Sequence, residues 1–381
     1  MSLSVLHVLP GLGFGGTEFV VARLARAERA LGVQNKVLYF KAGGPLVEEL
    51  RKEGIPCQRL TYRAGLSALA RWIFPFNKKG PSFDLVHGWL YSGNLIAGVL
   101  SRGYPGTRLV WNLMQANLTP EVNSLKTRFL MAVGAPLSPR WPDRIVCNSV
   151  AAQKAHEGIG FDSSKMVMIP NGVDTDRFQP NPEARAQFRN EWELSPEAIV
   201  LGHLARWDPQ KDHRTLVEAF TLLVGQGVNA HLFMAGPGVT KENPLLMKWI
   251  QETGVPERFH LLGSIDNAPR FLAGLDIFCL SSLGESSSYA LAEAMACGVP
   301  AVATNVGDAR DVVGETGVVV PPAQPQTFCE GILHLTSLSS AARTHQGVLA
   351  RDRIVQNYSF NKMMGAYQTL YRSILQEDSA G

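Results

Sequence analysis

The sequence predicts two α/β domains, each a doubly wound parallel sheet with helices on both faces. The chain has 381 residues, which is too long for one ordinary domain and about right for two. Short runs that are apolar throughout alternate with helix-like stretches from end to end, as is typical of parallel sheets covered on both sides. The alternation is interrupted once, at residues 170–188, where prolines, asparagines and other polar residues indicate a linker.

The predicted strands follow one another in two series. In the first half we expect strands at residues 3–9, 34–40, 83–89, 107–113, 143–149 and 166–170. In the second half we expect them at residues 198–205, 230–236, 258–263, 276–282, 299–305 and 317–322. The final segment, FNKMMGAYQTLYRSILQ, has apolar residues at helical spacing and predicts a capping helix. The resulting division is 1–176, 177–358 and a C-terminal helical segment, 359–381. Ligands of such sheets bind beyond the carboxyl ends of the strands, so we expect the site between the two domains.

Composition narrows the class of protein. Hydrophobic residues make up 45% and charged residues 18%, which predicts a folded globular chain, and the net charge of +3 suits a phosphate-bearing ligand or an anionic membrane without requiring either. No nucleic-acid partner is expected. The five cysteines are odd in number and far apart, which predicts buried reduced thiols and a cytoplasmic protein. No run of ~18 apolar residues predicts a membrane span, and the N-terminus does not resemble a signal peptide.

A glycine-rich stretch, PGLGFGGTE at residues 10–18, places Gly11, Gly13 and Gly16 at the G-x-G-x-x-G spacing of dinucleotide-binding loops. That type of site needs an acidic residue about 20 positions later, to hold the ribose diol. Between Glu28 and Glu48 there is no Asp or Glu, and Pro10 displaces the glycines from the strand. The sequence therefore argues against a dehydrogenase.

Residues 281–322 contain the most informative pattern. Glu285 follows a predicted strand, Ser286, Ser287 and Ser288 are natural N-cap and first-turn residues, and ALAEAMA predicts a helix that ends at Gly298. The free amide groups of the first turn favour an anion there. Glu285 and Glu293, about two turns apart, offer carboxylates that accept hydrogen bonds from sugar and ribose hydroxyls. The structural alternative for Glu293 is a solvated helix residue.

A second cluster, HLARWDPQKDH at 203–213, ends a strand with Arg206 and begins a helix near Lys211. Two cations at the carboxyl end of a strand can bind a diphosphate and stabilise the negative charge that grows on it when it acts as a leaving group. The structural alternative is a pair of surface ion pairs with Asp208 and Asp212.

Taken together, six motifs in order resemble the family 4 retaining glycosyltransferases of the two-Rossmann-domain (GT-B) type. They are the early GGTE, the PNGVDTDRF linker, the Arg206–Lys211 pair, the E-x7-E pair Glu285 and Glu293, the following EAMACGVPAVAT, and VGETGVVVPP. The resemblance covers nearly the whole chain and implies a nucleotide-sugar donor, linked to uridine or guanosine diphosphate, with no further cofactor and no metal.

The resemblance also implies roles for individual residues. Glu285 would contact the donor sugar, Glu293 the ribose hydroxyls, and Arg206 and Lys211 the diphosphate, with help from the segment after Glu285. The predicted donor-binding set is Gly15, Gly16, Arg206, Lys211, Glu285, Ser286, Ser287, Ser288, Tyr289 and Glu293. Gly15 and Gly16 would let the first domain close over the donor, and the C-terminal helix would cross back to that domain.

The implied reaction transfers a hexose with retained anomeric configuration to a hydroxyl of a glycan or lipid-linked acceptor, in bacterial surface polysaccharide or lipopolysaccharide assembly. Two alternatives stay open: another nucleotide-sugar enzyme of this fold, such as a 2-epimerase, and a non-catalytic sugar-nucleotide-binding protein. Asp174-Thr175-Asp176 matches the D-x-D metal motif of other glycosyltransferases, but its place after PNGV indicates a turn.

The predicted acceptor site lies in the first domain. Many family members have H-x-H at the end of the fourth strand, whereas this chain has His87-Gly88-Trp89. His87 is therefore either a catalytic residue or a core histidine, and Trp89, Asn112 and Gln115 are candidate acceptor contacts because they lie at strand ends.

Residues 70–81, ARWIFPFNKKGP, combine aromatic and basic residues. They predict either peripheral contact with an anionic membrane or an ordinary helix end.

Overall fold

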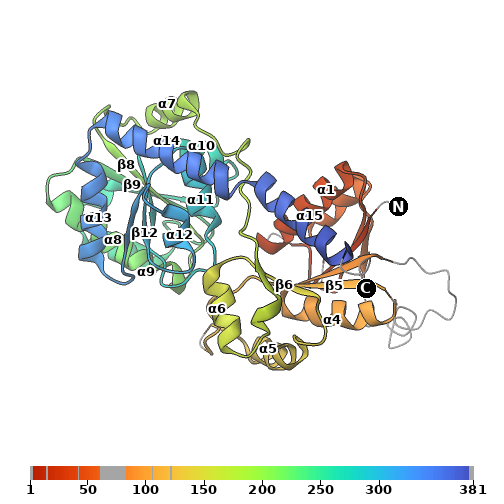
Figure 1. The fold of residues 1–381 in the computed structure, drawn as a ribbon. Helices are drawn as coiled ribbons and strands as arrows, with labels where there is room; N and C mark the ends of the chain where they lie inside the picture. Colours follow the sequence, from red (N-terminus) through yellow and green to blue (C-terminus); the bar gives the residue numbers. More distant parts are fainter. Residues whose placement is uncertain are drawn as a thin grey trace. The chain divides into compact units, whose positions relative to one another are not determined.

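The structure, a computed structural model, describes residues 3–13, 16–41, 43–60, 83–104, 106–120 and 122–376. The chain divides into two compact units (Figure 1). Unit 1 comprises Met1–Asn171 together with Met363–Gly381, and unit 2 comprises Gly172–Lys362. The last helix, α15 (Phe360–Gln376), has the bounds that its apolar spacing predicts, and nearly all of it belongs to unit 1.

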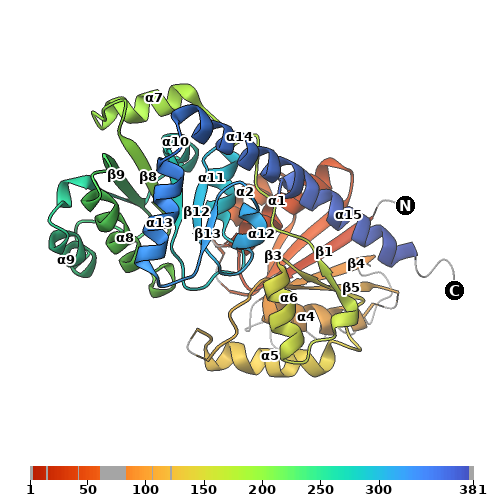
Figure 2. The ribbon, with the colours of Figure 1, turned by 60° about the vertical axis from the view of Figure 1, so that its left-hand side comes forward.

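Unit 1 is built on a parallel sheet of seven described strands in the order β3-β2-β1-β4-β5-β6-β7. The strands are β1 (Ser4–Leu9), β2 (Gln34–Tyr39), β3 (Cys57–Arg59), β4 (Leu85–Trp89), β5 (Arg108–Leu113), β6 (Arg144–Cys147) and β7 (Met166–Met168). The connecting helices are α1 (Gly16–Ala30), α2 (Pro45–Lys52), α4 (Leu90–Arg102), α5 (Leu125–Leu137), α6 (Val150–Gly158) and the short η2 (Ser163–Lys165). Helices α4, α5 and α6 cover one face, whereas α1 and α15 cover the other (Figures 1 and 2).

Unit 2 repeats the design with a sheet in the order β10-β9-β8-β11-β12-β13, again parallel throughout. Its strands are β8 (Ile199–Leu204), β9 (Ala230–Ala235), β10 (Phe259–Gly263), β11 (Ile277–Leu280), β12 (Ala301–Thr304) and β13 (Val318–Val320). Its helices are α7 (Pro182–Glu191), η3 (Pro209–Lys211), α8 (His213–Gly225), α9 (Pro244–Glu252), η4 (Pro256–Arg258), α10 (Ala268–Ala273), α11 (Tyr289–Ala296), α12 (Ala309–Val313), α13 (Pro325–Thr336) and α14 (Ser340–Asn357).

Two apolar cores lie on opposite faces of the unit 2 sheet. One packs α8, α9 and α13 through residues such as Phe220, Ile250 and Phe328. The other packs α10, α11 and α14 through residues such as Phe271, Met295 and Ile354. Strand residues contribute to both cores, which explains why the strands are apolar throughout rather than alternating.

Strand order reverses between β1 and β4 in unit 1 and between β8 and β11 in unit 2. At such a reversal the two following loops diverge and leave a crevice at the carboxyl edge of the sheet, where ligands of open α/β sheets bind. The loops after β8 and β11 contain Arg206, Lys211 and Glu285, the residues that the sequence singles out. Topology thus brings these two distant segments to one edge of unit 2.

The predicted α/β fold class is confirmed, and each of the twelve predicted runs contains a strand. The prediction missed β3, because CQR has no apolar run, and it assigned the first part of α7 to the linker. That helix is polar, but Pro182 at its start and the side chain of Asn181, which accepts from the backbone N of Ala184, define its beginning. All five cysteines are free and buried, as predicted. Gly15 and residues 70–81 lie outside the described residues.

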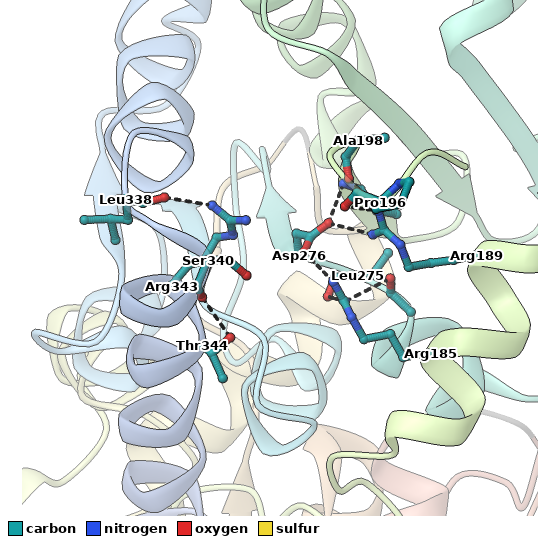
Figure 3. Close-up of polar contacts among 12 residues, drawn as sticks. Arg185, Arg189, Pro196, Ala198, Leu275, Asp276, Leu338, Ser340, Arg343 and Thr344 are labelled. Carbon is teal, nitrogen blue, oxygen red and sulfur yellow. Dashed lines mark hydrogen bonds and ion pairs between the residues drawn. The ribbon is translucent and has the colours of Figure 1, made fainter. Parts of the chain in front are cut away.

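An ion-pair cluster fixes α7 to the amino-terminal edge of the unit 2 sheet (Figure 3). Asp276 directly precedes β11. Its Oδ1 accepts a hydrogen bond from Arg185 (2.5 Å). Its Oδ2 accepts from Arg189 (3.2 Å) and from the backbone N of Val200 (2.8 Å). Only 9% of the Asp276 side chain is exposed. Beside it, a hollow of about 270 Å³ reaches Arg343, whose guanidinium donates to the backbone oxygen of Leu338.

Candidate active site

The loop after β8 presents two cations at the carboxyl edge of the unit 2 sheet. Asp208 caps the short turn η3 by accepting from the backbone N of Gln210 (2.9 Å), and it also accepts from the guanidinium of Arg206 (2.7 Å from Nη2). The Arg206 side chain is 62% exposed. An exposed ion pair contributes little free energy, so a competing anion can draw Arg206 away from Asp208 at small cost.

Lys211 does not pair with Asp212, contrary to the structural alternative for this residue. Its Nζ donates instead to Oε1 of Glu285 (2.5 Å), in the loop after β11. The two side chains are 17% and 10% exposed. The same carboxylate oxygen accepts from the hydroxyl of Ser282 (2.8 Å). Residues that are 74 positions apart in the sequence therefore form one partly buried cluster at the predicted crevice.

Backbone contacts hold the two loops together. The hydroxyl of Ser281 donates to the backbone oxygen of Lys211 (2.9 Å), and the backbone N of Leu283 donates to the oxygen of Gln210 (2.7 Å). Asp212 adopts a left-handed conformation (φ 44°), and its side chain caps α8 by accepting from the backbone N of Thr215. The position of Lys211 is thus set by bonds on both sides of it.

Helix α11 starts directly after the serine-rich segment. The Ser288 side chain caps it by accepting from the backbone N of Leu291 (3.4 Å), while Ser286 and Ser287 are half-buried. The first turn of a helix carries unpaired N–H groups and the positive end of the helix dipole, which together favour an anion. Glu293 is half-buried on the same helix. Burial and, to a lesser extent, the negative charge of Glu293 raise the pKa of the Cys297 thiol to about 12.

A third loop, after β12, packs against the serine-rich segment. Gly307 has a φ of +57°, and a Cβ there would lie 2.6 Å from the backbone oxygen of Glu285 and 2.7 Å from that of Ser286. The next residue, Asp308, donates its backbone N–H to the oxygen of Ser286 (3.2 Å). Asp308 is not among the predicted site residues, although its place after a strand and a glycine is a usable signal.

Two buried histidines lie behind the cations. His203 donates from Nδ1 to the backbone oxygen of Cys279 (2.9 Å), and its ring meets that of His213 edge-on at 4.9 Å. Burial lowers the pKa of His203 to about 4 and that of His213 to about 3. Both imidazoles are therefore neutral near pH 7, so they add no charge beside Lys211.

The predicted acceptor residues of unit 1 are mostly in its core. His87 and Trp89 have no exposed surface, and their rings stack at 4.1 Å. The Trp89 indole donates to Nδ1 of His7 (3.2 Å), and Nδ1 of His87 bonds the hydroxyl of Tyr371 on α15 (2.7 Å). Burial lowers the pKa of His87 well below its ordinary value. The observed placement fits a core histidine, and an acceptor contact by Trp89 would require its side chain to move.

Asn112 is also buried and donates from Nδ2 to the hydroxyl of Tyr367 (2.9 Å). Gln115 is half-buried and donates to Oδ1 of Asn123 (2.6 Å). Gly16, the first residue of α1, is exposed. The acceptor roles of these residues stay predictions.

The D-x-D motif forms a turn. Oδ1 of Asp174 accepts from the backbone N of Arg177 (3.0 Å), and the backbone oxygen of Asp174 accepts from the N of Phe178 (2.8 Å). Within the described part of the chain, no three His, Cys, Asp or Glu side chains come together in a way that could hold a metal ion.

Two known families match the chain in succession. Residues 14–177 match the family described as "Glycosyltransferase Family 4", and residues 196–337 match "Glycosyl transferases group 1". The chain belongs to glycosyltransferase family 4. It is therefore a glycosyltransferase of the GT-B type, as the six sequence motifs predicted.

Individual relatives of this glycosyltransferase are distant. The N-acetyl-alpha-D-glucosaminyl L-malate synthase of Bacillus anthracis is 28% identical over 197 residues, 51% of each chain. The phosphatidyl-myo-inositol mannosyltransferase of Mycobacterium leprae is 25% identical over 94% of this chain and 93% of its own. The chain thus matches about half of the first relative and nearly all of the second.

Among solved structures, HepE of Anabaena in complex with UDP has a TM-score of 0.84 at 22% identity, covering 98% of this chain and 100% of its own. HepE in complex with UDP-glucose has a TM-score of 0.79 at 21% identity. These likenesses confirm the GT-B fold. In the part of this glycosyltransferase that the structure describes, no helix has the length and apolar character needed to cross a bilayer.

Proposed function

We propose that this family 4 glycosyltransferase transfers a hexose from a UDP- or GDP-linked donor to a hydroxyl of a glycan or lipid-linked acceptor, with retention of the anomeric configuration. The observation that carries the proposal is the Lys211–Glu285 cluster at the strand-order reversal of unit 2, next to the capped start of α11. This arrangement offers a carboxylate for sugar hydroxyls and positive charge for a diphosphate within one edge of the sheet. The HepE complexes with UDP and UDP-glucose, a protein of the same fold, support a nucleotide-sugar donor.

Each residue of the cluster takes a distinct part. Arg206 and Lys211 bind the diphosphate, assisted by the amides that follow Glu285. Glu285 accepts hydrogen bonds from the sugar, and Glu293 accepts them from the ribose diol. The exposed Arg206 exchanges Asp208 for phosphate at little cost, while Lys211 holds the Glu285 side chain in place until the donor binds.

In the transfer step the acceptor oxygen bonds to the anomeric carbon on the face from which the diphosphate leaves. The bond between that carbon and the diphosphate oxygen breaks, and its electron pair goes to the diphosphate, which also takes the proton of the acceptor hydroxyl. Negative charge therefore grows on the diphosphate, where Arg206, Lys211 and the start of α11 stabilise it most strongly in the transition state. We propose that these cations suffice and that no metal is required.

Unit 1 supplies the acceptor site in this proposal, and the reaction takes place in the cytoplasm, at or near the inner face of the membrane. Assembly of a surface polysaccharide or related glycoconjugate fits an acceptor of this kind. The relative from Mycobacterium leprae, named for a phosphatidyl-myo-inositol acceptor, supports the lipid-linked alternative.

The test is a screen of nucleotide sugars, read by release of nucleoside diphosphate with and without candidate acceptors. We expect one uridine or guanosine donor to be hydrolysed slowly alone and faster with an acceptor, and the anomeric proton coupling of the product to show retention. Lys211→Met should abolish the release of nucleoside diphosphate. Conversion of the sugar to its epimer without an acceptor would favour the 2-epimerase, and binding without turnover would favour a non-catalytic protein.

A further inference from the structure

Asp308 is a buried carboxyl group behind the proposed donor-binding loop, and it takes no part in the chemistry described above. Only 5% of the residue is exposed. The hydroxyl of Ser287 donates a hydrogen bond to the carboxyl group, but the side-chain oxygen Oδ1 is buried and has no hydrogen-bond partner among the residues that the structure describes. A buried carboxylate with an unsatisfied oxygen is costly, and protonation reduces that cost.

The segment around Asp308 is locked to the donor-binding loop through the backbone. Its N–H donates to the oxygen of Ser286, and Gly307 approaches the oxygens of Glu285 and Ser286 so closely that no Cβ would fit. With the bond from Ser287, the Gly307–Asp308 segment contacts three consecutive residues of the loop. A change in the charge of Asp308 therefore acts directly on the segment whose amides face the diphosphate in the proposed site.

The charged groups around Asp308 favour its neutral form. Burial is the largest cause that raises the pKa of Asp308, to about 7; the hydrogen bond from Ser287 opposes this rise, and the charges of Glu285, in the loop after β11, and Asp311, on α12, add to it. Tyr358, directly after α14, donates its hydroxyl to the backbone oxygen of Asp311 (2.9 Å), and Arg353 on α14 donates to that of Val312 (2.9 Å).

The nearby cations are engaged elsewhere. On α12 itself, Arg310 donates to Asn305. Lys211, the cation of the adjacent loop, is paired with Glu285. The charged groups that shift the pKa of Asp308 most, Glu285 and Asp311, are both negative.

We propose that Asp308 is a positioning residue for the donor, and that it holds the Glu285–Ser288 loop in its binding form only while it carries a proton. This inference rests on the proposed function, because the loop is taken to receive a donor diphosphate. The diphosphate of a nucleotide sugar carries two negative charges, so donor binding and ionisation of Asp308 oppose each other. Binding a donor near neutral pH then draws a proton onto Asp308.

The sign of the effect follows from linkage. Because the donor stabilises the protonated form, the pKa of Asp308 is higher in the complex than in the free chain, and affinity falls as pH rises through the free value of about 7. Each unit by which the bound donor raises the pKa of Asp308 corresponds to a tenfold loss of donor affinity at high pH. His203 and His213, with pKa values of about 4 and about 3, titrate well below pH 7 and therefore do not cause the same fall in donor affinity.

The experiment measures the dissociation constant of the nucleotide sugar that binds in the screen above, starting with UDP-glucose and GDP-mannose, between about pH 6 and about pH 8.5. Their diphosphates do not titrate in this range. For the unmodified chain we expect the dissociation constant to rise at least threefold over this range, and about sevenfold if the donor raises the pKa of Asp308 by one unit. In Asp308→Asn, which keeps size and hydrogen bonding without charge, it should stay within about twofold of its low-pH value.

Asp311→Asn is the matched control, since it removes an exposed carboxylate from α12, the short helix that Asp308 precedes. It should keep the loss of affinity at high pH, moved to a somewhat lower pH, because Asp311 raises the pKa of Asp308. Asp308→Ala, which also loses the bond from Ser287, should bind the donor more weakly at every pH. A flat profile for the unmodified chain, or an unchanged loss of affinity at high pH in Asp308→Asn, would overturn this inference and leave the proposed function intact. Absence of binding by every nucleotide sugar at every pH would overturn both.

Discussion

Breaking the Lys211–Glu285 pair should destabilise unit 2 strongly. In Lys211→Met the Glu285 carboxylate, with 10% of its side chain exposed, keeps the hydroxyl of Ser282 as its only donor among the described residues. Removing one partner of a buried pair costs about 3–5 kcal/mol, and the remaining exposure places this case near the lower end, at about 3 kcal/mol. For a unit of this size that loss lowers the melting temperature by roughly 6–12 °C.

The assay is urea unfolding of Lys211→Met, Glu285→Gln and the double variant, followed by fluorescence and circular dichroism. The double variant should recover about 2 kcal/mol relative to Lys211→Met, because no uncompensated charge remains. Lys248→Met is the matched control: its pair with Glu252 is exposed and 3.9 Å long, so its loss should cost less than about 0.5 kcal/mol. If Lys211→Met were as stable as this control, the pair would be hydrated and the reasoning about the cluster would fail.

Two further substitutions test the loops and the sheet edge. Gly307→Ala should weaken donor binding more than tenfold, because a Cβ 2.6 Å from the oxygen of Glu285 forces the loop to shift, as isothermal titration would show. Gly254→Ala, also at positive φ but with nothing within 4 Å, should cost only about 1 kcal/mol of strain and bind normally; equal effects would contradict the steric argument. Asp276→Ala should lower the free energy of unfolding by about 3 kcal/mol in urea titrations, because it leaves Arg185 and Arg189 unpaired; a loss under about 1 kcal/mol would show that this cluster is not structural.

The sequence predicted the strands and the edge of the sheet at which the candidate residues lie. Strands covered on both faces are apolar throughout, so apolar runs bounded by turn residues and helix-like stretches suffice to find them. The exceptions have physical causes: β3 (Cys57–Arg59) is a short edge strand with little apolar content, and α7 is a polar helix held by ion pairs rather than by an apolar stripe.

Side-chain partners were less predictable than elements. The choice between Asp212 and Glu285 as the partner of Lys211 depends on two loops that are far apart in the sequence. His87 and Trp89 end a strand, but a strand buried on both faces gives no signal of which residues reach the surface. The burial of Asp308 likewise depends on the packing of three loops, which residue spacing does not reveal.

Nucleotide titration of Glu293→Ala tests the central claim, a donor site in unit 2, most directly. The matched control is Glu330→Ala, which removes an exposed glutamate that likewise lies near a buried cysteine, Cys329, on another helix of the same unit. With UDP and GDP as probes, we expect the unmodified chain and Glu330→Ala to bind one of them alike. Glu293→Ala should bind it at least tenfold more weakly, because the ribose hydroxyls lose a charged acceptor. Equal binding by Glu293→Ala, or no binding of either nucleotide by the unmodified chain, would contradict the account.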